Sequence, residues 1–267
     1  MSTTAIIGAG VMGETLLSGL IRAGRPVSEL LVGEKRPERA QELVEKYAVS
    51  VVSNVDATKG ADTIALVVKP QDMGALLDEI APAVRPGQLV VSLAAGITTA
   101  FLESRLPDGV AVVRVMPNTP ALVDEGMAAI APGSHCDDDH LAIAEGLLAS
   151  TGRVLRVPEK QMDAVTAISG TGPAYVFFVV ESMIEAGVHL GLPRATATEL
   201  VVQTLVGSGK MLRETGTHPV VLREQVTSPG GTTAAALREL EVHKVRAAFL
   251  AAMEAARDRS AQLAEGS

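Results

Sequence analysis

The sequence is poor in aromatic side chains, in cysteine and in positive charge. It has no Trp, two Tyr and four Phe among 267 residues, so its core must be built from Ala, Val, Leu, Ile and Met. The single cysteine, Cys136, excludes an internal disulfide and a cysteine-based zinc cluster. The formal net charge of −8 disfavours a general nucleic-acid binder or a binder of anionic membranes. These absences favour a globular protein of a reducing cytoplasm.

Long hydrophobic runs are also lacking. The longest run in the second half, AYVFFVV, ends at Glu181, whereas a helix that spans a bilayer needs about 20 apolar residues. The chain opens directly into TTAIIGAG with no basic segment, so we expect no signal peptide. We therefore predict a cytoplasmic protein with no membrane partner.

Short β-rich runs alternate with amphipathic stretches over residues 1–158. The runs predicted as buried parallel strands are Thr4–Gly8, Leu30–Val32, Ser50–Ser53, Thr63–Val68, Gln88–Leu93 and Val110–Val115. The sequences GMAAIAP and GRVLRVP are expected to add two strands at the edge of the sheet. The helical patterns between the strands are Glu14–Ala23, Pro37–Tyr47 and Asp72–Val84. This alternation predicts an α/β fold with a Rossmann-type doubly wound sheet.

Only helix signals follow Pro158. We therefore predict a dinucleotide-binding domain over residues 1–158 and an all-helical domain over residues 159–267. Pro193 marks the start of one long helix and Gly216 its end. A final helix carries an apolar face that runs from Val245 to Ala256.

The helices around Tyr175–Leu190 and Arg194–Arg213 are apolar on more than one face. A small bundle cannot bury all of this surface by itself. We predict that a second copy of the chain covers it, which makes the protein a homodimer at least. The alternative is that the first domain covers one of these faces.

A dinucleotide-binding fingerprint follows the first predicted strand. In IIGAGVMGETLLSGL, Gly8, Gly10 and Gly13 form G-x-G-x-x-G, which allows a tight turn, close approach to a pyrophosphate and close packing of helix on strand. Glu34 ends the second strand, about 20 residues later, where an acidic side chain accepts a hydrogen bond from the ribose 2′-hydroxyl of NAD. The motif predicts a nicotinamide dinucleotide as cofactor.

The basic residues next to Glu34 leave the choice of coenzyme open. Lys35, Arg36 and Arg39 would neutralise a 2′-phosphate, and the alternative is that they form a solvated helix start. We expect NADPH, with NADH as a second possibility.

Further polar or small residues follow other strands of the sheet. Lys69 closes a buried strand, Ala94–Gly96 would permit close approach of a nicotinamide ring, and Asn118 would bind the carboxamide or a backbone turn. The five histidines are scattered without metal-ligand spacing, so we expect them on the surface or at helix ends, and we expect no metal. No nucleophile–base pair is evident in the sequence either. This suits hydride transfer, which needs positioning more than side-chain acid–base chemistry.

The stretch VTSPGGTTAAALREL, residues 226–240, places many backbone and hydroxyl donors before an apolar helix. Gly230 and Gly231 expose backbone N–H groups, and Ser228 and Thr233 add hydroxyls, which suits an anion. The alternative is that Ser228 or Thr232 is only the N-cap.

Three later motifs carry a resemblance to a known family. The motifs RVMPNTP (Arg114–Pro120), MDAVTAISGTGPAYVF (Met162–Phe177) and HPVVLREQVTSPGGTTAAALRELE (His218–Glu241) closely resemble Δ1-pyrroline-5-carboxylate reductase. Together with GAGVMG and VVKP in the right order, they extend the resemblance over essentially the whole chain. The family commonly has SGSGPAY, whereas this chain has Thr171 in the middle. The resemblance implies NAD(P)H-dependent reduction of 1-pyrroline-5-carboxylate to L-proline. It also implies a Rossmann domain, a helical dimerisation domain and often a decamer of five dimers.

The resemblance also implies roles for residues of this chain. The anion held by the stretch 226–240 would be the substrate carboxylate. Thr233, Ser228 and Glu159 would have catalytic roles. The residues expected to contact substrate are Glu159, Gly230, Gly231, Thr232 and Thr233. The residues expected to bind cofactor are Gly8, Ala9, Gly10, Val11, Met12, Gly13, Glu34, Lys35, Arg36, Asn54, Val68, Lys69, Pro70, Leu93, Ala94, Ala95 and Gln225.

Two other functions remain open from the sequence. A β-hydroxyacid dehydrogenase shares the opening fingerprint and a helical second domain, but it depends on a lysine, for which Lys210 in GSGKML is superficially similar. We interpret Lys210 as a solvated helix residue. The second alternative function is that of a redox sensor, which would bind NADP without turnover.

Overall fold

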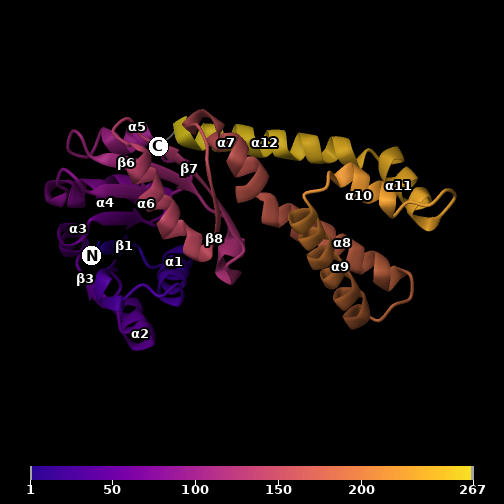
Figure 1. The fold of residues 1–267 in the computed structure, drawn as a ribbon, viewed down its shortest axis with the longest axis horizontal. Coiled ribbons are helices and arrows are strands. Elements are labelled where there is room, and N and C mark those ends of the chain that lie inside the picture. Colours follow the sequence, from indigo (N-terminus) through magenta and orange to yellow (C-terminus); the bar gives the residue numbers. More distant parts are fainter. Residues whose placement is uncertain (1, 266–267) are drawn as a thin grey trace. The chain divides into compact units, whose positions relative to one another are not determined.

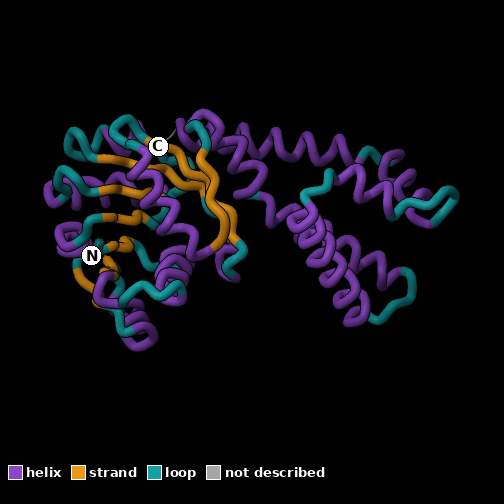
Figure 2. Tube along the Cα trace, viewed as in Figure 1, coloured by secondary structure: helices purple, strands orange, loops and turns teal. Residues whose placement is uncertain are grey.

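The structure, a computed structural model, describes residues 2–265. The chain folds into two compact units (Figures 1 and 2). The Rossmann unit comprises Met1–Thr171 and Ala256–Ser267, and the helical unit comprises Gly172–Ala255. This division follows which residues lie together in space, whereas the boundary predicted at Pro158 follows the change from strands to helices along the sequence. Residues 159–170 are helical but belong to the Rossmann unit.

The Rossmann unit is built on one sheet of eight strands, ordered β3-β2-β1-β4-β5-β6-β7-β8. The strands are β1 (Thr4–Ile7), β2 (Leu30–Gly33), β3 (Ser50–Val52), β4 (Thr63–Leu66), β5 (Leu89–Ser92), β6 (Ala111–Met116), β7 (Gly126–Pro132) and β8 (Gly152–Arg156). Strands β1 to β6 are parallel, β7 runs antiparallel to β6, and β8 runs parallel to β7. The predicted strands are confirmed, including the two at the edge.

Helices cover both faces of this sheet. They are α1 (Val11–Arg22), α2 (Pro37–Tyr47), α3 (Asn54–Gly60), α4 (Met73–Ile80), α5 (Thr99–Glu103), α6 (Asp138–Leu148) and α7 (Met162–Val165). Alternate strand residues point to opposite faces, and they form two buried clusters. Ile6 packs in the cluster of α1, α2 and α6, whereas Ile7 packs in the cluster of α3, α4 and α5. The predicted doubly wound α/β fold is confirmed.

A third buried cluster explains why α7 belongs to the Rossmann unit. Met162 packs with Ala129 and Ala131 of β7 and with Val157. The last turns of the final helix join them, since the Ser260 hydroxyl donates to Oδ1 of Asp163 at 2.8 Å. The chain therefore leaves the Rossmann unit after Thr171 and returns to it at Ala256.

The helical unit has no strand within its described residues. Its helices are α8 (Gly172–His189), α9 (Arg194–Thr215), α10 (Pro219–Gln225), α11 (Thr232–Val242) and the first half of α12 (Val245–Glu265). Pro193 is the N-cap of α9 and Gly216, in the left-handed conformation with φ +61°, is its C-cap, so the predicted ends of this helix are confirmed.

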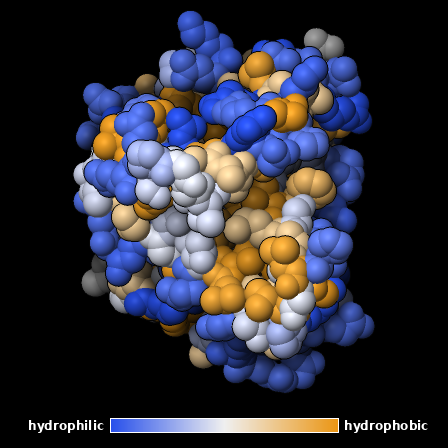
Figure 3. All heavy atoms as spheres, turned by 90° about the vertical axis from the view of Figure 1, so that its right-hand side faces the viewer, coloured by the Kyte–Doolittle hydropathy of each residue, from blue (hydrophilic) through white to orange (hydrophobic). Residues whose placement is uncertain are grey.

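The helical run Glu159–His189, which includes a π-helical turn at Thr166–Gly170, is long and apolar enough to cross a membrane by length and composition alone. A core or interface helix of a soluble protein can share this composition. The hydrophobic residues of α8 and α9 are largely exposed within one chain. Figure 3 views the molecule from the side where these helices are drawn and shows hydrophobic side chains gathered on that face.

Candidate functional site

A groove of about 530 Å³ runs along the carboxyl ends of β1, β2 and β4 in the Rossmann unit. This is the edge of a doubly wound sheet where ligands bind. Nine of the residues expected to bind cofactor line it, namely Gly8, Ala9, Gly10, Glu34, Lys35, Arg36, Asn54, Val68 and Lys69. The groove therefore brings together most of the cofactor residues predicted from this part of the chain.

The three fingerprint glycines differ in what an added side chain would meet. Gly8 has φ +94°, and a Cβ there would lie 2.9 Å from Val68 Cγ1. A Cβ on Gly13 would lie 2.1 Å from the carbonyl oxygen of Gly8, so only glycine lets α1 start this close to the turn. A Cβ on Gly10 would meet no protein atom within 4 Å, and its φ of −67° suits any residue. The fold does not need glycine at position 10, whereas a pyrophosphate lying against the backbone would need it. The loop therefore fits a dinucleotide.

Glu34 and Arg36 form a compact pair on the rim of the groove. Oε1 of Glu34 accepts from the Arg36 backbone N–H at 2.9 Å and from Nε at 3.0 Å, while Oε2 accepts from Nη2 at 3.1 Å. Oε2 also accepts from the backbone N–H of Ala9 at 3.3 Å. Burial alone would raise the pKa of Glu34, but the hydrogen bonds from Arg36 and Ala9 lower it. Glu34 is thus ionised at neutral pH beside the dinucleotide loop.

The other predicted basic residues have different surroundings. Lys35 Nζ lies 2.7 Å from Oε2 of Glu79, a carboxylate that also accepts from the Asn54 amide. Lys69 is exposed on the groove lining and has no ion pair within the described part of the chain.

The sequence did not indicate that Glu14 helps to hold the dinucleotide loop. Arg39 donates through Nε to the Ala9 carbonyl oxygen at 3.0 Å and pairs with Glu14 through Nη2. Lys46 and the Tyr47 hydroxyl also donate to Glu14, at 2.9 and 2.8 Å. Hydrogen bonds from Lys46, Arg39 and Tyr47 outweigh burial and lower the pKa of Glu14 to about 2. Arg39 ties α2 to this loop, and its expected contact with a 2′-phosphate stays a prediction.

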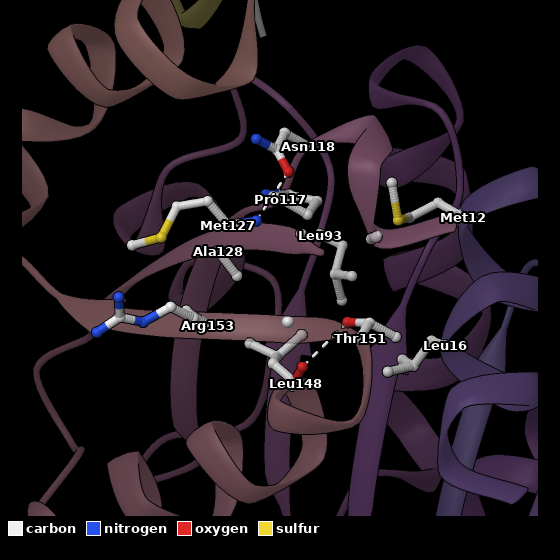
Figure 4. A pocket seen from close by; sticks show the side chains of 13 residues that line it. Met12, Leu16, Leu93, Pro117, Asn118, Met127, Ala128, Leu148, Thr151 and Arg153 are labelled. Carbon is white, nitrogen blue, oxygen red and sulfur yellow. Dashed lines mark hydrogen bonds between the residues drawn. The ribbon is translucent and has the colours of Figure 1, made fainter. Parts of the chain in front are cut away.

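A small cavity of about 10 Å³ lies in the Rossmann unit beside the first turn of α1 (Figure 4). Met12 and Leu93, both expected to bind cofactor, line it together with Asn118. The Asn118 amide donates to the Ser169 carbonyl oxygen at 3.1 Å, and Oδ1 accepts from the backbone N–H of Met127 at 2.8 Å. Asn118 therefore binds backbone, which was one of its two predicted roles.

Glu159 lies in a partly buried network and uses both carboxylate oxygens. Oε1 accepts from the backbone N–H of Thr99 at 2.8 Å, and Oε2 accepts from its hydroxyl at 2.5 Å. Arg114 Nη1 donates to Oε1 at 3.1 Å. Burial would raise the pKa of Glu159, but these hydrogen bonds lower it. Its expected role as a substrate contact stays a prediction.

The start of α11 is built without a side-chain cap. Gly231 is the N-cap and makes no side-chain capping bond, so the alternative that Ser228 or Thr232 caps the helix is wrong. The physical reason is that the Ser228 carbonyl oxygen accepts from the Gly231 N–H at 3.1 Å, a turn that uses the Ser228 backbone instead of its hydroxyl. The expectation that the Gly231 N–H is free for an anion is therefore wrong. Gly230 has φ +69°. Within residues 2–265, the hydroxyls of Ser228, Thr232 and Thr233 have no hydrogen-bond partner. These donors are available to a ligand.

Several other predicted residues have plain structural positions. His140, His218 and His243 bond to backbone at helix ends. Lys210 is exposed on α9, 3.6 Å from Glu214, as expected of a solvated residue. Gln225 ends α10 in the helical unit.

The chain can now be compared with known proteins. Residues 159–263 match the family described as pyrroline-5-carboxylate reductase dimerisation, and residues 3–96 match the one described as NADP oxidoreductase, coenzyme F420-dependent. Pyrroline-5-carboxylate reductase of Mycobacterium tuberculosis is 46% identical, over 98% of this chain and 97% of the relative. The chain belongs to the pyrroline-5-carboxylate reductase family.

Solved structures of the pyrroline-5-carboxylate reductase family agree with this assignment. The enzyme from Coxiella burnetii has a TM-score of 0.94 with 35% identity, and 98% of each chain is covered. The Plasmodium falciparum enzyme, solved with NADP bound, has a TM-score of 0.88 with 31% identity over the same shares. The match to a dimerisation family supports oligomerisation through the helical part of the chain.

Proposed function

We propose that the chain reduces 1-pyrroline-5-carboxylate to L-proline with hydride from NADPH, and that NADH is an alternative donor. This reaction on a C=N bond would be the last step of proline biosynthesis in the cytoplasm. The observation that carries the proposal is the start of α11, where uncapped backbone N–H groups and free hydroxyls suit a carboxylate. Membership of the family identifies the substrate that carries this carboxylate as 1-pyrroline-5-carboxylate.

The proposed division of labour follows the two units. In the Rossmann unit, the Gly8–Gly13 loop and the groove residues bind the coenzyme, which supplies a hydride to the imine carbon when bound. In the helical unit, Gly230, Thr232 and Thr233 hold the substrate carboxylate, with Ser228 as an additional donor. Gly231 lines the site, since its own N–H is used within the turn. The ring nitrogen takes its proton before hydride transfer, so no essential side-chain acid is proposed.

We also propose that two copies of the chain form at least a homodimer. Five such dimers can assemble into the decamer that the family often forms. Within one chain, Phe177 and Phe178 of α8 are exposed. A partner that covers them would complete a core that the helical unit lacks alone. In that arrangement the helical unit of one copy completes the site of the other.

The proposal is tested by following coenzyme oxidation with the purified full-length chain. We expect turnover with pyrroline-5-carboxylate and formation of proline, and no activity on a panel of 3-hydroxy acids with the oxidised coenzymes. Activity on a 3-hydroxy acid would favour the dehydrogenase alternative. Coenzyme binding without turnover on either substrate would favour the redox-sensor alternative.

The Thr233→Ala variant tests the proposed carboxylate site. Loss of one hydrogen bond to a charged group costs about 1.5–3 kcal/mol, so KM for pyrroline-5-carboxylate should rise about tenfold or more while KM for NADPH changes little. Thr198→Ala on α9 is the matched control, since its hydroxyl already donates to the Arg194 carbonyl oxygen. A lower melting temperature with unchanged KM would show that Thr233 is only structural.

A further inference from the structure

The loop between β5 and α5, residues 93–98, lies at the carboxyl edge of a central strand. It begins with Leu93, Ala94 and Ala95, which are expected to contact the coenzyme. Because β4 and β5 are neighbours in the sheet, this loop is adjacent to the end of β4, which lines the coenzyme groove. A loop that forms a binding surface must be fixed by the residues behind it.

One end of this loop is fixed by Glu159. Thr99 is the first residue of α5, directly after the N-cap Thr98. It donates to Glu159 with both its backbone N–H, at 2.8 Å, and its hydroxyl, at 2.5 Å. A single carboxylate thus sets the position of the Thr99 backbone and side chain together.

Arg114 of β6 holds the carboxylate in turn. Its side chain is 7% exposed, that of Glu159 is 29% exposed, and the Nη1–Oε1 distance is 3.1 Å. A buried guanidinium beside a carboxylate keeps the carboxylate charged and strengthens the hydrogen bonds that it accepts. We call Glu159, Thr99 and Arg114 the Glu159 cluster.

The last turns of α12 support the same loop near its middle. Gly96 has φ +77°, and a Cβ there would lie 3.7 Å from Leu263 Cβ. Ser260, buried on the same helix, donates to Asp163 of α7 at 2.8 Å. Two residues that come after Pro158 in the sequence, Glu159 and Leu263, therefore lie beside this loop.

We propose that Glu159 is a positioning residue, which fixes the 93–98 loop through Thr99 for the nicotinamide end of the coenzyme and does not touch the pyrroline carboxylate. The proposal rests on the proposed function for the identity of the coenzyme. It assigns Glu159 a role different from the substrate contact that the family resemblance implied. Both oxygens of Glu159 already have partners within the Rossmann unit, whereas the hydroxyls at the described start of α11 have none.

The test uses Glu159→Gln, Thr99→Val and the conservative control Thr99→Ser. Glu159→Gln keeps the size of the side chain but presents an amide N–H₂ where two donors need an acceptor. Thr99→Val removes the hydroxyl alone, and Thr99→Ser retains it. The first readout is the Kd for NADPH, measured by coenzyme fluorescence in the absence of pyrroline-5-carboxylate.

We expect Glu159→Gln and Thr99→Val each to raise the Kd for NADPH about tenfold. Each variant loses a hydrogen bond between Thr99 and the charged Glu159, so the loop is less ordered and NADPH binding has to order it. The double variant should bind about as weakly as either single variant, because both changes break the same contact. Thr99→Ser should bind NADPH as the unchanged chain does. KM for pyrroline-5-carboxylate, extrapolated to saturating NADPH, should stay within about twofold in every variant.

Two results would overturn the inference. One is a raised KM for pyrroline-5-carboxylate in Glu159→Gln with unchanged Kd for NADPH, which would make Glu159 a substrate contact. The other is normal NADPH binding by Thr99→Val. If Glu159→Gln does not fold, the Thr99→Val and Thr99→Ser pair still decides. If pyrroline-5-carboxylate is not turned over at all, the proposed function fails while the Kd comparison still tests the Glu159 cluster.

Discussion

The two units bury their hydrophobic residues to very different extents. In the Rossmann unit, whole strands such as β4 and β5 are buried on both faces, and three core clusters fill the space around the sheet. Among the described hydrophobic residues of the helical unit, only Ala197 and Val201 are buried, while large apolar side chains on α8 and α9 stay exposed. One unit contains its own core. The other leaves most of its hydrophobic side chains exposed, and we propose that a partner chain covers them.

Breaking the proposed partner contact should have the largest effect. Phe178 on α8 is 70% exposed in one chain. Phe178→Glu would place an unpaired charge in the interface, which costs several kcal/mol, so we expect monomers and an activity loss of about a hundredfold or more. Light scattering after size-exclusion chromatography measures the assembly.

The matched control is Ile143→Glu on α6 of the Rossmann unit, where Ile143 is 47% exposed. This unit has its own core, so the control should remain oligomeric and active. An oligomeric, fully active Phe178→Glu variant would contradict the comparison between the two units.

The next effect separates binding from folding inside the Rossmann unit. Gly13→Ala would force a Cβ to 2.1 Å from the Gly8 carbonyl oxygen, so we expect a loss of about 1–3 kcal/mol of stability. Gly10→Val has open space around its Cβ and should keep its melting temperature. It should nevertheless weaken NADPH binding more than about tenfold, because the side chain would occupy the path of the pyrophosphate. Similar melting temperatures for both variants would refute this distinction.

Arg36→Gln tests the coenzyme preference of the same groove. Arg36 is paired with Glu34 but exposed, so it can reach a 2′-phosphate. We expect KM for NADPH to rise about tenfold, since a charge-assisted bond is lost, while KM for NADH stays nearly constant. Parallel measurements with both coenzymes provide the control. Equal changes for the two would mean that Arg36 does not recognise the 2′-phosphate.

The smallest effect concerns acid stability through Glu14. Its folded pKa of about 2 lies below the ordinary glutamate value of 4.5. The stability that it contributes is therefore present above about pH 4.5 and is lost as pH falls towards 2. The shift corresponds to an upper bound of about 3 kcal/mol, reduced by solvent screening because the side chain is 21% exposed. Glu14→Gln should flatten the dependence of unfolding free energy on pH in this range, which urea titrations at several pH values would measure. An unchanged pH dependence would mean that Glu14 contributes no such stability.

These contrasts also explain what could be predicted from the sequence. Strands buried on both faces appear as continuous apolar runs, so the sheet was predictable. The apolar pattern places the start of α1 at Glu14, but the helix begins at Val11, because the dinucleotide loop leads directly into it. The short helices α3 and α5 are not evident from periodicity, since they depend on the caps provided by Ser53 and Thr98.

The parts of the site that escaped prediction depend on contacts between residues far apart in the sequence. Nothing near Glu159 indicates that Thr99 will donate two hydrogen bonds to it. The return of α12 to the Rossmann unit includes the contact of Ser260 with Asp163, which are 97 residues apart. The local sequence pattern identified which residues carry hydrogen-bond donors at the start of α11. Only the structure showed that the hydroxyls of Ser228 and Thr232 do not cap the helix.

Mixing two defective chains tests the central claim most directly, namely that each site combines the Rossmann unit of one copy with the helical unit of another. One chain carries Gly10→Val and the other Thr233→Ala, and native mass spectrometry verifies that they form heterodimers. At low pyrroline-5-carboxylate concentration each chain alone should have little activity. The mixture should regain activity, because one site of each heterodimer then combines two unaltered halves. Verified heterodimers without recovered activity would contradict the account and place each site within a single chain.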